Sequence, residues 1–227
     1  MGGILCRRVA EDDLDRLIAV LVGVLDSFDC SGDKLADDLR DVVAGVAYLK
    51  TLPYVNGSKM GITGISYGGI MTMAAVARAP DVFQAALPQS GYANWISFQD
   101  YNAELQHTKL LAYEWGPYPD SAAVYRRNSS IFLAKNVKAP VFVVHGVGKE
   151  TSWRPGVVPI IASKEYALAL EREYKVVMYK TYPGETYYIS GRDNNRQLLL
   201  DMGEFFGRYL KDGGAVVPAR TSLGGNP

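Results

Sequence analysis

The segment with the clearest chemical meaning is residues 64–68, Gly-Ile-Ser-Tyr-Gly, which fits the pattern G-x-S-x-G. The apolar residues 60–65 favour a buried strand, and residues 70–79 favour a helix. A serine on a sharp turn between a strand and a helix is a nucleophile elbow, whose strained backbone makes the serine oxygen project from the sheet. We therefore predict that Ser66 is the nucleophile of an acyl transfer and that the Tyr67 backbone amide is one oxyanion donor. The alternative interpretation is a Gly-rich loop without chemistry.

Strand and helix patterns alternate on both sides of this segment. Apolar residues recur at helical spacing over residues 33–49, and Asn56-Gly57 predicts a turn before the elbow strand. Further strands are predicted at 17–25, 85–88, 140–144 and 176–182, and further helices at 163–174 and 195–210. Residues 91–130 are interpreted as a polar and aromatic stretch. This alternation predicts an α/β fold with a mostly parallel sheet and helices on both faces.

Several motifs extend this pattern over most of the chain. They are Gly-Ile-Ser-Tyr-Gly-Gly at 64–69, Pro-Asp-Val-Phe at 80–83, Ser-Gly-Tyr-Ala-Asn-Trp at 90–95, Gly-Pro at 116–117, Pro-Val-Phe-Val-Val-His-Gly at 140–146 and Tyr-Pro-Gly-Glu at 182–185. In their order and spacing they resemble the catalytic domain of the prolyl oligopeptidase family of serine peptidases, which includes dipeptidyl peptidases and acylaminoacyl peptidases. The resemblance covers residues 33–211.

The resemblance implies an α/β-hydrolase fold that is shortened at its N-terminus. We expect an N-terminal segment at residues 1–32 with one strand, an α/β-hydrolase core at residues 33–211 and a mobile tail at residues 212–227. The family's catalytic domain has further strands before this region, so a sheet edge is expected to be exposed. A second copy of the chain could cover that edge.

The resemblance also implies positions for the other catalytic groups. The family aspartate follows the His-Gly pair by about three residues, a position that Lys149 occupies here, with Glu150 one residue later as an alternative acid. The family histidine stands in a Glu-x-His pattern, and Tyr187 occupies its position. A phenol with a pKa of about 10 is a poor general base near neutral pH.

Two histidines remain as sources of a base. His145 ends a predicted strand and is interpreted as a hydrogen-bonded core residue. His107 lies in the segment that borders the substrate pocket in the family, so it is a candidate for a displaced base; the alternative is a surface histidine. The family's second oxyanion donor has no matching segment, and residues 26–31 are the local candidate.

Aromatic residues suggest a substrate pocket. Tyr92 and Trp95 match positions whose aromatic side chains form the family's apolar pocket beside the scissile bond. Tyr101, Tyr113 and Trp115 continue this aromatic segment. The alternative is that these residues only fill the core.

Charge and cysteine content narrow the classes of function. Basic and acidic residues number 24 each, which favours neither a nucleic-acid nor a membrane partner. Two cysteines and two distant histidines do not build a zinc site, and no phosphate-binding glycine motif is present, so we expect neither a metal nor another cofactor. The longest apolar run, residues 17–25, is too short to span a bilayer as a helix. With no signal-peptide pattern, a cytoplasmic location is expected.

Three hypotheses follow. The chain is a serine hydrolase, an esterase or peptidase that acts on a small ester or short peptide through Ser66 with an unusual base. Alternatively, it is a catalytically impaired pseudoenzyme that binds a ligand or a partner. The third hypothesis is that it is an altered or incomplete version of a larger enzyme.

Overall fold

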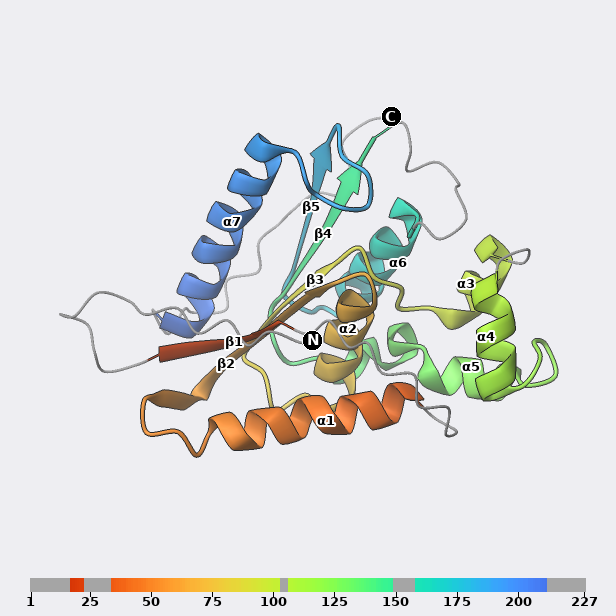
Figure 1. The fold of residues 1–227 in the computed structure, drawn as a ribbon, viewed down its shortest axis with the longest axis horizontal. Helices are drawn as coiled ribbons and strands as arrows, with labels where there is room; N and C mark the ends of the chain where they lie inside the picture. Colours follow the sequence, from red (N-terminus) through yellow and green to blue (C-terminus); the bar gives the residue numbers. More distant parts are fainter. Residues whose placement is uncertain (1–16, 23–33, 103–105, 149–157, 212–227) are drawn as a thin grey trace.

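The computed structural model describes residues 17–22, 34–102, 106–148 and 158–211. Within them, five strands form one parallel sheet in the order β1-β2-β3-β4-β5. The strands are β1 (Leu17–Val22), β2 (Val55–Ile65), β3 (Ala85–Gln89), β4 (Val141–Val147) and β5 (Val177–Pro183). The predicted parallel α/β sheet is therefore confirmed (Figure 1).

Helices cover both faces of the sheet. Alternate residues of a strand point to opposite faces, and the apolar residues on each face pack against a different set of helices. Val141 and Val143 of β4 belong to the core cluster that includes α1 (Lys34–Leu49), α2 (Tyr67–Arg78) and α6 (Ile160–Arg172). Phe142 and Val144 belong instead to the cluster that includes α7 (Arg192–Phe206) and its π-helical extension η3 (Gly207–Lys211). Figure 1 shows α7 on one side of the sheet and α1, α2 and α6 on the other.

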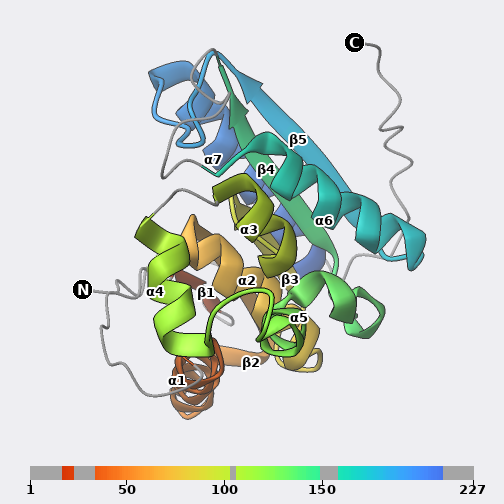
Figure 2. The same cartoon turned by 90° about the vertical axis from the view of Figure 1, so that its right-hand side faces the viewer.

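The stretch between β3 and β4 is largely helical. It contains α3 (Trp95–Asn102), α4 (Gln106–Trp115), α5 (Ala122–Asn128) and the 3-10 helix η2 (Ser130–Asn136). Figure 2 shows α3, α4 and α5 grouped together. These short helices were not predicted, because aromatic rings from several of them pack in one cluster around Trp95 and Trp115 instead of repeating along a stripe.

The predicted turn at Asn56-Gly57 is wrong. The turn lies earlier, at residues 52–55, where the Val55 amide donates to the Leu52 carbonyl. Strand β2 then begins at Val55. Asn56 instead lies within β2, where its side-chain oxygen accepts hydrogen bonds from the Ser58 amide and hydroxyl. The pairing with β1 is irregular here, so the turn-forming pair occupies a bulge inside the strand.

The described part of the chain leaves β1 and β5 at the two edges of the sheet. Residues 17–22 confirm part of the strand predicted at 17–25, whereas the remainder of that strand, most of the N-terminal segment and the tail lie outside the described residues. The domain boundaries and the covering of an edge by a second copy stay predictions. No helix in the described ranges is long and apolar enough to cross a membrane.

Candidate active site

Ser66 occupies a strained turn between the elbow strand and the elbow helix. β2 ends at Ile65 and α2 begins at Tyr67, so Ser66 is the single residue between them. Its φ of 57° and ψ of −116° lie in a region that ordinary residues avoid. Such a conformation costs about 1–3 kcal/mol and persists only when the surrounding structure holds it. The predicted strand-turn-helix geometry is present.

The close contact between strand and helix explains two glycines of the motif. A Cβ atom on Gly64 would lie 2.6 Å from the carbonyl carbon and oxygen of Gly68. A Cβ atom on Gly69 would lie 2.4 Å from the carbonyl oxygen of Gln89, at the end of β3. Both neighbours are backbone atoms that cannot move aside easily, so any larger residue would push α2 away from the sheet.

Backbone hydrogen bonds fix Ser66 on both sides. The Ser66 amide donates to the Gln89 carbonyl over 3.0 Å, and the Ser66 carbonyl accepts from the Ile70 amide over 3.0 Å. The Ser66 side chain makes no capping hydrogen bond to α2. The dipole of α2 favours negative charge at its N-terminus, next to Ser66. The first turn of α2 contains no acidic residue that would oppose this effect. The geometry suits an acyl transfer in which negative charge develops on the substrate carbonyl oxygen beside Ser66.

The loop after β5 brings Tyr187 beside this turn. The buried Ser90, which follows Gln89, donates a hydrogen bond from its hydroxyl to the Tyr187 carbonyl over 2.6 Å. Burial, followed by the neighbouring Tyr188, raises the pKa of the Tyr187 phenol above its usual 10. The phenol therefore keeps its proton near neutral pH, which makes it a donor and not a base.

A carboxylate fixes the same loop from within. Glu185 is buried, and its oxygens accept hydrogen bonds from the amides of Ser190 and Gly191 over 2.9–3.1 Å and from the Asn194 side chain over 2.8 Å. The bonds from Gly191, then from Asn194, hold the pKa of Glu185 below its usual value despite burial. Glu185 thus ties the loop that contains Tyr187 to the start of α7.

The prediction that His145 is a hydrogen-bonded core residue is confirmed. It is fully buried, its Nε2 lies 3.1 Å from the Val158 carbonyl, and its Nδ1 lies 2.8 Å from the Ser163 hydroxyl. A carbonyl only accepts, so Nε2 holds the proton and Nδ1 accepts from Ser163. Burial lowers the pKa of His145 to about 4. Both ring nitrogens are occupied, so His145 has no free position from which to act as a base on Ser66.

The other predicted positions are described less fully. Lys149 and Glu150 lie outside the described residues. His107 belongs to the first turn of α4, and the structure describes its backbone only. The candidate acid and the displaced base therefore stay predictions.

Tyr92 and Trp95 lie in a packed aromatic cluster. They are 4% and 6% exposed, and each packs edge-on against Phe98 with ring centroids 4.7 and 5.2 Å apart. Trp95 also packs edge-on against Trp115 at 5.3 Å, whereas Tyr113 is exposed. Their role in a substrate pocket stays a prediction.

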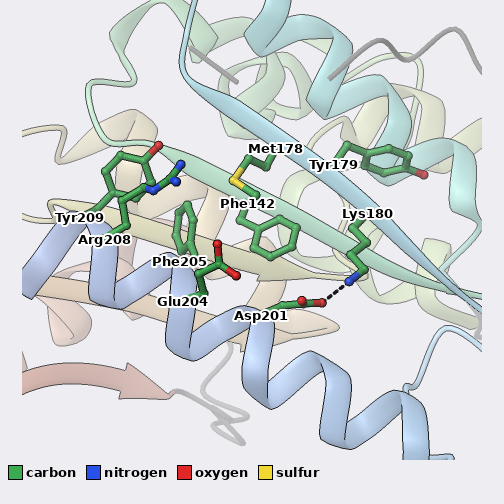
Figure 3. A pocket seen from close by; sticks show the side chains of 9 residues that line it. All are labelled: Phe142, Met178, Tyr179, Lys180, Asp201, Glu204, Phe205, Arg208 and Tyr209. Carbon is green, nitrogen blue, oxygen red and sulfur yellow. Dashed lines mark hydrogen bonds and ion pairs between the residues drawn. The ribbon is translucent and has the colours of Figure 1, made fainter. Parts of the chain in front are cut away.

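A described cavity lies elsewhere, between β5 and α7. It has a volume of about 230 Å³ and is lined by Phe142, Met178, Tyr179, Lys180, Asp201, Glu204, Phe205, Arg208 and Tyr209 (Figure 3). Lys180 and Asp201 form an ion pair within it, and the Tyr182 hydroxyl also donates to Asp201. These charges are satisfied by each other. In the described ranges no cluster of three metal-ligating side chains occurs, at this cavity or at the elbow.

Taken together, the parallel sheet, the strained serine and the glycine contacts define an α/β-hydrolase core. The sequence model of the prolyl oligopeptidase family matches residues 28–213, so the chain belongs to this family of serine peptidases.

Individual relatives agree with the family. The chain is 28% identical over 169 residues to the uncharacterized peptidase YuxL of Bacillus subtilis, which covers 74% of this chain and 24% of that protein. A solved acylaminoacyl peptidase in complex with Z-Gly-Gly-Phe-chloromethyl ketone superposes with a TM-score of 0.68 at 26% identity, covering 79% of this chain and 29% of that one. A puromycin-hydrolyzing peptidase of Mycobacterium tuberculosis superposes with a TM-score of 0.66 at 25% identity, covering 77% and 25%. The chain thus spans about a quarter of the length of the relatives it matches.

Proposed function

We propose that this chain is a serine hydrolase that transfers acyl groups through Ser66 and acts on short peptides or small esters. The strained elbow is the observation that carries this proposal, because a conformation that costs about 1–3 kcal/mol is retained where it serves a site. The Ser66 oxygen adds to the substrate carbonyl carbon while its proton passes to a base. The Tyr67 amide donates to the oxyanion, the leaving amine or alcohol takes the proton, and water then hydrolyses the acyl-enzyme.

We propose that His107 is the base that accepts the proton of Ser66, because of the position of α4, the helix that contains residue 107. Burial, then the hydrogen bond to Asp38, then the charges of Asp38 and of Glu114 on α4 raise the pKa of Tyr67. Leu111 of α4 is buried. The face of α4 that bears residues 111 and 114 therefore lies toward the core and the side chain of Tyr67. Residue 107 precedes them by four and seven positions, and residues at this spacing share one face of a helix.

The decisive test of Ser66 is labelling of the intact protein with a fluorophosphonate, read by mass spectrometry. We expect one covalent adduct at Ser66 and none in Ser66→Ala. Absence of an adduct after hours, from a protein that melts cooperatively, would overturn the proposal.

The test of His107 is the rate of the same labelling reaction. We expect His107→Gln to slow it by about 10²–10⁴-fold, the usual contribution of a general base. The matched control is His145→Gln, assayed at pH 7.5, because His145 is already neutral and occupied on both nitrogens. Equal rates for His107→Gln and the unmodified protein would exclude His107 as the base.

A second candidate function is a pseudoenzyme that binds a ligand or partner without turnover. Two residues favour this function, because neither can serve as the general base. The Tyr187 phenol keeps its proton near neutral pH, and His145 is held in the core by hydrogen bonds. A protein that fails to react with the fluorophosphonate but binds an N-blocked peptide ending in phenylalanine, measured by calorimetry, would support this function over the first.

A further inference from the structure

A buried carboxylate contacts the residue that follows the nucleophile. Asp38 is 6% exposed and lies on the face of α1 that also carries the buried residues Leu35 and Leu39. The Tyr67 hydroxyl donates a hydrogen bond to Asp38 Oδ2 over 2.5 Å. A carboxyl group that is removed from water needs such a partner to replace its hydrogen bonds to the solvent. This bond joins α1 to the first residue of α2.

Tyr67 therefore contributes both to the proposed oxyanion site and to the attachment of α2 to α1. Its backbone amide is the proposed oxyanion donor, and its side chain is anchored to α1. On the opposite side, the amide of Ser66 is tied to Gln89 at the end of β3. The strained Ser66 lies between these two attachments, and such a backbone persists only when its neighbours hold it from several directions.

We propose that Asp38 is a positioning residue for the nucleophile, which holds the first residue of α2 against the strained Ser66 through the hydroxyl of Tyr67. This inference rests on the proposed function of Ser66. Burial, followed by the bond to Asp38, raises the pKa of the Tyr67 phenol above its usual 10, so the donor keeps its proton throughout the pH range of ordinary assays. Tyr67 therefore stays a hydrogen-bond donor in these assays, and the proposed effect of its bond to Asp38 is on geometry.

The first readout is the rate of fluorophosphonate labelling at Ser66. We expect Asp38→Ala and Tyr67→Phe to lower this rate about tenfold or more, since a small misplacement of reacting groups is costly. Asp38→Asn keeps an acceptor for the Tyr67 hydroxyl and should stay within about threefold of the unmodified protein. The matched control is Val46→Ala, a truncation of a buried residue two turns further along α1. It should lower thermal stability without changing the labelling rate.

The second readout does not depend on any chemistry at Ser66. Hydrogen exchange, followed by mass spectrometry of the peptide that covers residues 64–70, reports directly on how firmly the elbow is held. We expect faster exchange there in Asp38→Ala than in Val46→Ala. Equal exchange in these two variants would overturn the role of Asp38. If the unmodified protein does not label but the exchange difference is present, the proposed function fails and the positioning by Asp38 stands.

Discussion

The Ser90 hydroxyl donates a 2.6 Å hydrogen bond to the backbone carbonyl of Tyr187, 97 positions later in the chain. Ser90 is also bonded through its amide to the Val144 carbonyl of β4 over 3.0 Å. One buried residue thus connects the end of β3, the neighbouring strand and the loop that contains Tyr187. The loop after β5 is fixed against the elbow by this contact, whatever side chain residue 187 has.

We predict that Ser90→Ala destabilises the protein by about 1–3 kcal/mol, because it leaves the Tyr187 carbonyl without its donor. Urea unfolding measures this loss. The control is Ser58→Ala, which removes an exposed hydroxyl bonded to Asn56 two residues away in β2 and should change stability by no more than about 0.5 kcal/mol. Equal stability of the two variants would show that the Ser90 bond does not hold the loop.

Tyr187→His should increase the rate of Ser66 labelling without reaching that of a full triad. An imidazole with a pKa near 6.5 can accept a proton at pH 7.5, and the loop lies beside the elbow. Lys149, which we predict at the position of the orienting acid, has no carboxylate, so the gain should stay below the roughly 10²–10⁴-fold that a well-positioned base supplies. Tyr187→Phe is the control and should label at the unmodified rate. A full peptidase rate in the single variant, or loss of labelling in Tyr187→Phe, would contradict this prediction.

Gly69→Ala should destabilise the protein by about 1–3 kcal/mol and slow labelling of Ser66. Its new methyl group would lie 2.4 Å from the Gln89 carbonyl oxygen, and overpacking against fixed backbone has this typical cost. Gly203→Ala is the matched control, because Gly203 lies in α7 with no heavy atom within 4 Å of an added Cβ. There the same substitution should stabilise the helix by roughly 0.5–1 kcal/mol. Chemical unfolding of both variants measures the difference, and destabilisation of equal size at both sites would disprove the packing argument.

The sheet and the elbow were predictable because they depend on local patterns. The apolar runs that end at Ile65 and Val144 are long enough to identify strands, and the small residues around Ser66 have few other uses. The helices over residues 95–128 were not predicted, because their positions depend on aromatic packing around Trp95 and Trp115. That packing joins residues far apart in the chain.

The polar contacts of the site were also missed, for a similar reason. Ser90 and Glu185 act through bonds to backbone groups, which no residue type announces. Asp38 did leave a signal, since it is a charged residue on the apolar face of α1. A carboxylate at such a position predicts a buried partner, although the sequence does not say which one.

Acid should destabilise the protein through His145. Burial lowers the pKa of this residue from 6.5 to about 4 in the folded state, so the unfolded chain takes up the proton first as the pH falls below 6.5. The stability that the neutral imidazole contributes is therefore complete above pH 6.5 and is lost as the pH approaches 4, with a loss of about 2 kcal/mol by pH 5. Urea unfolding at pH 7.5 and 5.0 measures this loss. His145→Gln should show a shallower decline than the unmodified protein, whereas His107→Gln should retain the full decline. If His145→Gln declined as steeply, the buried imidazole would not be the group that limits stability in acid.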